Sequence, residues 1–130
     1  MQYALGPEQL DKIENILQKD IMELNIHCVV LLDLAGNIIV NLNNGKVKYD
    51  IYSLAALAAG NFGAVSAMAQ MVGEEEFFLL FHKGKKESIY FCKILTDFLL
   101  ITIFGQDISL GFLRLRVDKS IEKIEKILPS

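Results

Sequence analysis

The chain has 130 residues, of which 52% are hydrophobic and 22% are charged, and its formal net charge is −3. This length suits one globular domain over residues 1–130, and the slight negative charge gives no reason to bind nucleic acid or an anionic membrane. The first residues show neither the basic region nor the apolar run of a signal peptide, so we expect a cytoplasmic protein.

Hydrophobic periodicity and turn residues divide the chain into helices and strands. Pro7 suits the first position of a helix, and apolar residues then recur at helical spacing until Asn25. Apolar runs that are short and rich in β-branched or aromatic residues are predicted to be strands. The last three of these runs are apolar on both faces, so either helices cover both faces of the sheet or another subunit covers part of one face. In chain order we predict a helix over 7–24, strands over 27–32 and 38–40, a helix over 51–73, strands over 77–82, 88–93 and 98–104, and a helix from Ser109 to Pro129.

The central helix, residues 51–73, contains no charged residue. Asp50 is expected to cap its start, and Gly73 its end. We predict that its large apolar side chains face the core: Leu54, Leu57, Val65, Met68 and Val72. We predict that its small side chains face outward, with two longer residues at their margin: Ala56, Gly60, Gly63, Ala64 and Ala67, with Gln70 and Met71.

The small face of this helix has three possible interpretations. A membrane span is disfavoured because Asn61, Ser66 and Gln70 lie within the helix. The small face could instead pack under another helix of the same domain. Because a mid-helix glycine costs about 1 kcal/mol relative to alanine, we favour close approach by a partner subunit or protein at Gly60 and Gly63.

No constellation of catalytic residues is visible in the sequence. His27 and His82 are predicted at strand ends without ligand-spaced carboxylates or cysteines, and Glu74-Glu75-Glu76 reads as a solvated turn. We therefore predict no enzyme, no metal site and no cofactor. Cys28 and Cys92 lie in apolar runs and are expected to be buried, unreactive thiols.

The order of these elements, together with particular residues, resembles the roadblock / dynein light chain family and, within it, the bacterial MglB-like branch. The features that carry the resemblance are the turn Asp33-Leu34-Ala35-Gly36, the Ala/Gly-rich central helix, the three-strand meander and the segment Leu110-Gly111-Phe112-Leu113-Arg114. Together they extend from Pro7 to Leu128.

The resemblance implies an α+β sandwich whose five-stranded antiparallel sheet, in the order 2-1-5-4-3, has helices on both faces. It also implies a homodimer joined along the third strands, through Phe77, Phe78, Leu79, Leu80 and Phe81. Relatives in this branch often have a longer charged C-terminal tail, whereas this sequence ends at Ser130, which puts any role of such a tail in doubt.

Function is expected from the same resemblance. We expect a homodimer that binds a small Ras-like, MglA-like GTPase and stimulates or tunes its GTP hydrolysis, without an active site of its own. The alternative is a dimeric scaffold that docks another cytoplasmic protein. A small-molecule sensor is disfavoured because the apolar runs lack convergent polar groups. Arg114 and Arg116 could in principle reach a nucleotide, and Gly84-Lys85-Lys86 is a basic hairpin tip.

Overall fold

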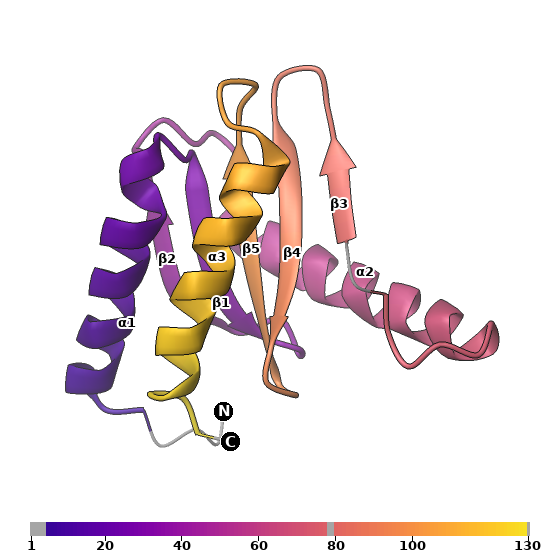
Figure 1. The fold of residues 1–130 in the computed structure, drawn as a ribbon. Coiled ribbons are helices and arrows are strands. Elements are labelled where there is room, and N and C mark those ends of the chain that lie inside the picture. The colour runs from indigo at the N-terminus through magenta and orange to yellow at the C-terminus, as the bar shows by residue number, and fades with distance from the viewer. Residues whose placement is uncertain (1–4, 78–79, 130) are drawn as a thin grey trace.

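The computed structural model describes residues 5–77 and 80–129. Its elements are α1 (Pro7–Asp20), a short 3-10 helix η1 (Met22–Leu24), β1 (Cys28–Asp33), β2 (Ile38–Asn43), α2 (Ile51–Met71), β3 (Leu80–Lys83), β4 (Ser88–Ile94), β5 (Phe98–Phe104) and α3 (Leu110–Glu125). The five strands form one antiparallel sheet in the order β2-β1-β5-β4-β3. Helices α1 and α3 lie on one face and α2 lies on the other (Figure 1). The predicted fold class and strand order are confirmed.

Two hydrophobic clusters lie on the two faces of the sheet, because neighbouring side chains of a strand point in opposite directions. Val29 and Leu31 of β1 pack in the cluster under α1 and α3, whereas Val30 and Leu32 pack in the cluster under α2. Every residue of β1 and of β5 is buried. Of the three runs predicted to be apolar and covered on both faces, only β5 is buried throughout. Strand β4 is partly covered, and His82 and Lys83 of β3 are exposed because β3 is an edge strand.

The N-terminal helix is shorter than predicted. It ends at Asp20, and a 3-10 turn follows before Asn25 adopts a left-handed conformation with φ of 65°. Ile21 leaves helical geometry and is fully buried. The Asn25 amide nitrogen donates to Asp107 at 2.9 Å. Asn25 does end the helical segment, but the apolar spacing across Ile21 could not reveal the break.

Two other element ends differ from the prediction, and strand pairing explains the one in β2. Strand β2 continues to Asn43, because Asn41 and Asn43 pair with Val30 and Cys28 of β1. Asparagine is uncommon in strands, and β2 tolerates it as an edge strand. At the other end of the chain, α3 stops at Glu125, four residues before Pro129.

The turn between β1 and β2 is held by the Asp33 side chain. Its carboxylate accepts hydrogen bonds from the backbone amides of Ala35 at 3.0 Å and Asn37 at 2.9 Å, and from the Asn37 side chain at 3.0 Å. Gly36 has a φ of +93°, and a Cβ atom there would lie 3.2 Å from the Cα atom of Ala56 in α2. The hairpin tip thus sits directly against α2.

Candidate interaction surface

Both ends of α2 are fixed by local structure. At its start the Asp50 carboxylate accepts from the backbone amide of Tyr52 at 3.0 Å and from the Ser53 hydroxyl at 2.7 Å. The Ser53 hydrogen bond, followed by that from Tyr52, lowers the pKa of Asp50. At its end Gly73 has a φ of +89°. The predicted caps are therefore confirmed.

The face of α2 that contacts the sheet is not the predicted one. Leu57, Met68 and Val72 were expected in the core, yet their side chains are 73%, 53% and 71% exposed, and Leu54 and Val65 are only half-buried. The buried residues of α2 are mostly alanines: Ile51, Ala55, Ala58, Ala59 and Ala69.

The physical reason is that α2 has no polar side that would define its orientation. Its residues are small or apolar on every side, so the stripe of large side chains did not identify the face that packs on the sheet. Alanines are the main residues that α2 turns toward the sheet, and its backbone lies close to the hairpin tip, where a Cβ atom built at Gly36 would lie 3.2 Å from the Cα atom of Ala56. We infer that close packing of α2 against the hairpin stabilises the fold more than burial of a few larger side chains would.

The residues predicted to bind a partner are nevertheless all exposed. Apart from the chain neighbours and the backbone of the helix itself, no atom of residues 5–77 and 80–129 lies within 4 Å of a Cβ atom built at Gly60 or Gly63. Large apolar residues flank this strip, among them Leu57 and Met71, the latter 86% exposed. We call the following set the α2 outer face: Ala56, Leu57, Gly60, Gly63, Ala64, Ala67, Met68, Gln70 and Met71.

The second half of α2 extends beyond the sheet. Figure 1 shows the helix crossing behind β4 and continuing past β3. Between Gly60 and Met71 only Ala69 is buried. By length and composition alone α2 could span a membrane, with a mean hydropathy of 1.4, but its first half packs on the sheet. Since the described part of the chain leaves most of this apolar helix end exposed, it is an unpartnered surface.

Strand β3 forms the edge of the sheet beside this overhang. It covers Leu80–Lys83, whereas residues 77–82 were predicted. Phe77 precedes the strand and is exposed, while Phe78 and Leu79 lie outside the described residues. Leu80 pairs with Phe91 of β4, and the ring of Phe81 stacks on Phe104 with centroids 6.0 Å apart.

Residues considered for catalysis do not gather at this surface. Arg114 and Arg116 are on α3, across the sheet from α2. His82 contacts the edge of the Phe91 ring. Among residues 5–77 and 80–129, no three histidine, cysteine or acidic side chains come together in a way that could hold a metal ion.

One polar pair was missed by sequence reasoning. The Nδ1 atom of His27 lies 3.0 Å from the Glu87 carboxylate, although 60 positions separate the two residues. Only the sheet brings the starts of β1 and β4 to the same end. No local spacing signal could have indicated this pair.

Comparison with known proteins places this geometry in context. A family model described as Roadblock/LC7 domain matches residues 16–104. No curated protein shows significant sequence similarity to the chain.

Several solved structures match most of the chain. Myxococcus xanthus MglB is 33% identical, with a TM-score of 0.85 over 95% of this chain and 92% of that one. The gliding protein MglB from Thermus thermophilus is 23% identical, with a TM-score of 0.85 over 97% of this chain and 95% of that one. A structure described as MglB with tetrameric arrangement is also 23% identical, with a TM-score of 0.87 over 97% of this chain and 94% of that one.

Proposed function

The chain belongs to the Roadblock/LC7 domain family, and from this we propose that it is a homodimeric, cytoplasmic regulator that binds a small Ras-like, MglA-like GTPase and stimulates or tunes its GTP hydrolysis. Its 33% identity to Myxococcus xanthus MglB over 95% of the chain supports an MglB-like role. The protein supplies no active site of its own; it acts through binding.

The observation that carries this proposal is the α2 outer face. It is free of charge over its whole length, and its two glycines leave the helix backbone open to close approach. Exposed apolar patches of this kind mark protein interaction sites in water-soluble proteins. We assign this face to the GTPase, with Ala56, Gly60, Gly63, Ala64, Ala67, Gln70 and Met71 as the contact residues.

A second copy of the chain is proposed to pair along β3. The edge position of β3 leaves one side of its backbone without a neighbouring strand among the described residues. Self-pairing would satisfy that side and extend the sheet, and a two-fold axis there would bring the overhanging halves of two α2 helices together. The contact residues for the dimer would be Phe77, Phe78, Leu79, Leu80 and Phe81.

Regulation then requires unequal binding to two states of the GTPase. A protein that binds both conformations of the GTPase equally does not shift the equilibrium between them. Tighter binding to the hydrolysis-competent conformation raises the population of that conformation. Because the dimer would contribute no catalytic group, its effect should saturate when every GTPase molecule is bound.

Single-turnover GTP hydrolysis by the MglA-like GTPase of the same genome, with and without the protein, tests the proposal. Gly63→Arg places a long cation on the α2 outer face and should abolish both binding and acceleration while the fold is retained. Gly111→Arg is a matched control. Gly111 is also an exposed helical glycine, and no described atom outside the local helix backbone and the neighbouring residues lies within 4 Å of a Cβ built there, but it lies on α3.

The outcomes separate the candidate functions. Binding without any change in hydrolysis rate would indicate the scaffold alternative. Unchanged GTPase affinity in Gly63→Arg would place the docking surface elsewhere on the molecule. Equal loss in Gly63→Arg and Gly111→Arg would mean that the arginine acts through the fold and not through the contact.

A further inference from the structure

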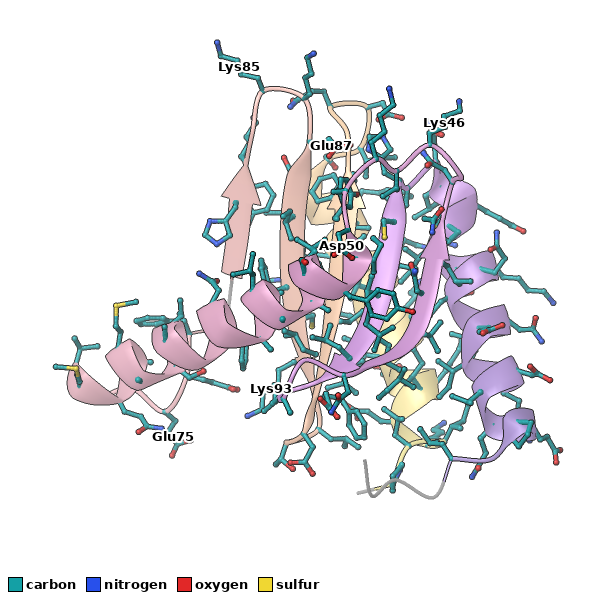
Figure 2. All side chains as sticks on the ribbon, turned by 180° about the vertical axis from the view of Figure 1, so that it is seen from behind. Lys46, Asp50, Glu75, Lys85, Glu87 and Lys93 are labelled. Atoms are coloured by element: carbon teal, nitrogen blue, oxygen red, sulfur yellow. The ribbon has the colours of Figure 1, made fainter. Side chains whose placement is uncertain are left out.

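A polar cavity opens at the end of the sheet where β1 and β4 begin. It has a volume of about 340 Å³, and its walls come from His27, Glu87 and the loop between β2 and α2. Figure 2 shows Lys46 and Glu87 at this end of the molecule, above Asp50 at the start of α2. The cavity therefore lies apart from the overhanging half of α2, which carries all of the proposed GTPase contacts except Ala56.

Some of the charged side chains around this cavity have a partner, and others do not. Glu87 is engaged, because its carboxylate lies 3.0 Å from His27 Nδ1. Lys46 and Lys48 also line the cavity, and neither ammonium group has a partner among the described residues. The unmatched charge is therefore positive, which favours an anion over a cation as the occupant.

A buried hydroxyl adds a specific hydrogen-bonding group. The hydroxyl oxygen of Tyr49 is buried and has no hydrogen-bond partner among the residues that the structure describes. A tyrosine hydroxyl is a protonated donor at neutral pH, and burial, with smaller effects from Cys28 and Glu87, raises the pKa of Tyr49 further. Buried hydroxyls normally have a partner, and a ligand oxygen would supply one here.

An apolar recess continues from the same walls. It has a volume of about 190 Å³, shares Tyr49 and Glu87 with the polar cavity, and is otherwise lined by Leu54, Ile89 and Ile103. Ligand sites commonly combine such an apolar floor with a few convergent polar groups. The sequence suggested no convergent polar groups between helix and sheet; the fold brings them together from the segment before β1, the segment before β4 and the loop before α2.

We propose that this paired cavity binds a small amphiphilic anion, a short apolar chain that ends in a carboxylate or a phosphate. The anionic group sits between Lys46 and Lys48 and accepts a hydrogen bond from Tyr49. The apolar chain lies against Leu54, Ile89 and Ile103. This site is independent of the GTPase surface, so its failure would leave the proposed function unaffected.

Chemical-shift titration of the ¹⁵N-labelled protein with four six-carbon probes tests the proposal. Hexanoate and hexyl phosphate should give saturable shifts of amides around the cavity, and whichever binds more tightly identifies the anionic group. Hexanamide, which is neutral, should bind at least about tenfold more weakly. The proposal is wrong if neither anion saturates by about 10 mM, or if hexanamide or hexylammonium binds as tightly as the anions.

Three variants locate the binding groups. Tyr49→Phe keeps the ring, removes only the unpartnered hydroxyl, and should weaken binding of the better anion about three- to tenfold. The double variant Lys46→Gln/Lys48→Gln should weaken it about tenfold. Lys85→Gln/Lys86→Gln makes the same charge change at the β3–β4 turn, outside the cavity, and should leave the affinity unchanged. Full affinity in Tyr49→Phe, or equal losses in both double variants, would overturn the assignment.

Discussion

Thr102 has a polar group that its buried surroundings do not satisfy. It is fully buried in β5, and its hydroxyl oxygen has no hydrogen-bond partner among the described residues. An unsatisfied buried hydroxyl reduces stability, so Thr102→Val should raise the free energy of unfolding by about 1 to 2 kcal/mol. Urea denaturation measures this change. Thr96→Val, at an exposed position, is the control and should change little; a loss of stability in Thr102→Val would mean that the hydroxyl does find a partner.

The two thiols should be unreactive in the native protein. Cys28 is fully buried and Cys92 half-buried, and neither forms a disulfide. Burial, followed by the negative charge of Glu87, raises the pKa of Cys28 from 9.0 to about 11, and burial also raises the pKa of Cys92. Labelling with iodoacetamide at pH 8 should be slow until denaturant is added.

The raised pKa of Cys28 also predicts a loss of stability at alkaline pH. Below pH 9 the thiol is protonated in both states; between pH 9 and about 11 the unfolded chain loses the proton first. The folded state is therefore disfavoured as pH rises through this window, by about 2 to 3 kcal/mol in total. Cys28→Ala should flatten the decline that begins at pH 9, and an unchanged profile would contradict the assignment.

At the level of elements, the contact between the β1–β2 turn and α2 is a close one. Gly36→Ala would introduce a Cβ atom 3.2 Å from the Ala56 Cα atom and force a residue into a left-handed backbone. We expect the free energy of unfolding to fall by about 2 to 4 kcal/mol. Gly45→Ala is a matched control because Gly45 also has a positive φ, of 80°, but, its two chain neighbours aside, no described atom lies within 4 Å of a Cβ built there. It should lose only about 1 kcal/mol.

Equal losses in the two variants would show that backbone conformation alone requires glycine at both positions. A larger loss in Gly36→Ala isolates the contribution of the packing between hairpin and helix. The aspartate-glycine turn was visible in the sequence as a hairpin signal. Its second role, against a helix that begins 15 positions later at Ile51, depends on the tertiary structure.

The elements also differ in how far the sequence could predict them. Strands β4 and β5 were predicted almost to the residue, because long apolar runs bounded by turns leave few alternatives. The orientation of α2 was predicted wrongly for Leu57 and Met68, since a helix that is small or apolar on all sides has no polar face to mark solvent. The predicted outward residues are exposed nonetheless, because the inner and outer faces of α2 both consist largely of small side chains.

At the level of the whole molecule, the fold followed from sequence pattern and family resemblance together. Strand order could not be read from spacing, because pairing between β1 and β5 joins segments about 70 positions apart. The paired cavity could not be predicted from the sequence either, because its walls come from four separate segments. Contacts between segments that are far apart in the chain leave no local pattern in one sequence, so they could not be predicted from it.

The proposed dimer gives a whole-molecule prediction. Light scattering at low micromolar concentration should give twice the chain mass of 14.6 kDa. Amides from Gly60 to Met71 should become more protected from hydrogen exchange as protein concentration rises, because this half of α2 has little protein beneath it in one copy. A monomer mass, or exchange rates in this segment that do not depend on concentration, would contradict the pairing.

The overhang of α2 has a consequence for how the protein would be maintained in a cell. If a second copy covers this helix end, an unpaired copy displays the same apolar surface that chaperones and proteases recognise in damaged proteins. Unpaired copies would then be degraded, and the lifetime of each chain would depend on whether it dimerises soon after synthesis. The geometry that forms the proposed docking surface would thereby also affect the abundance of the protein.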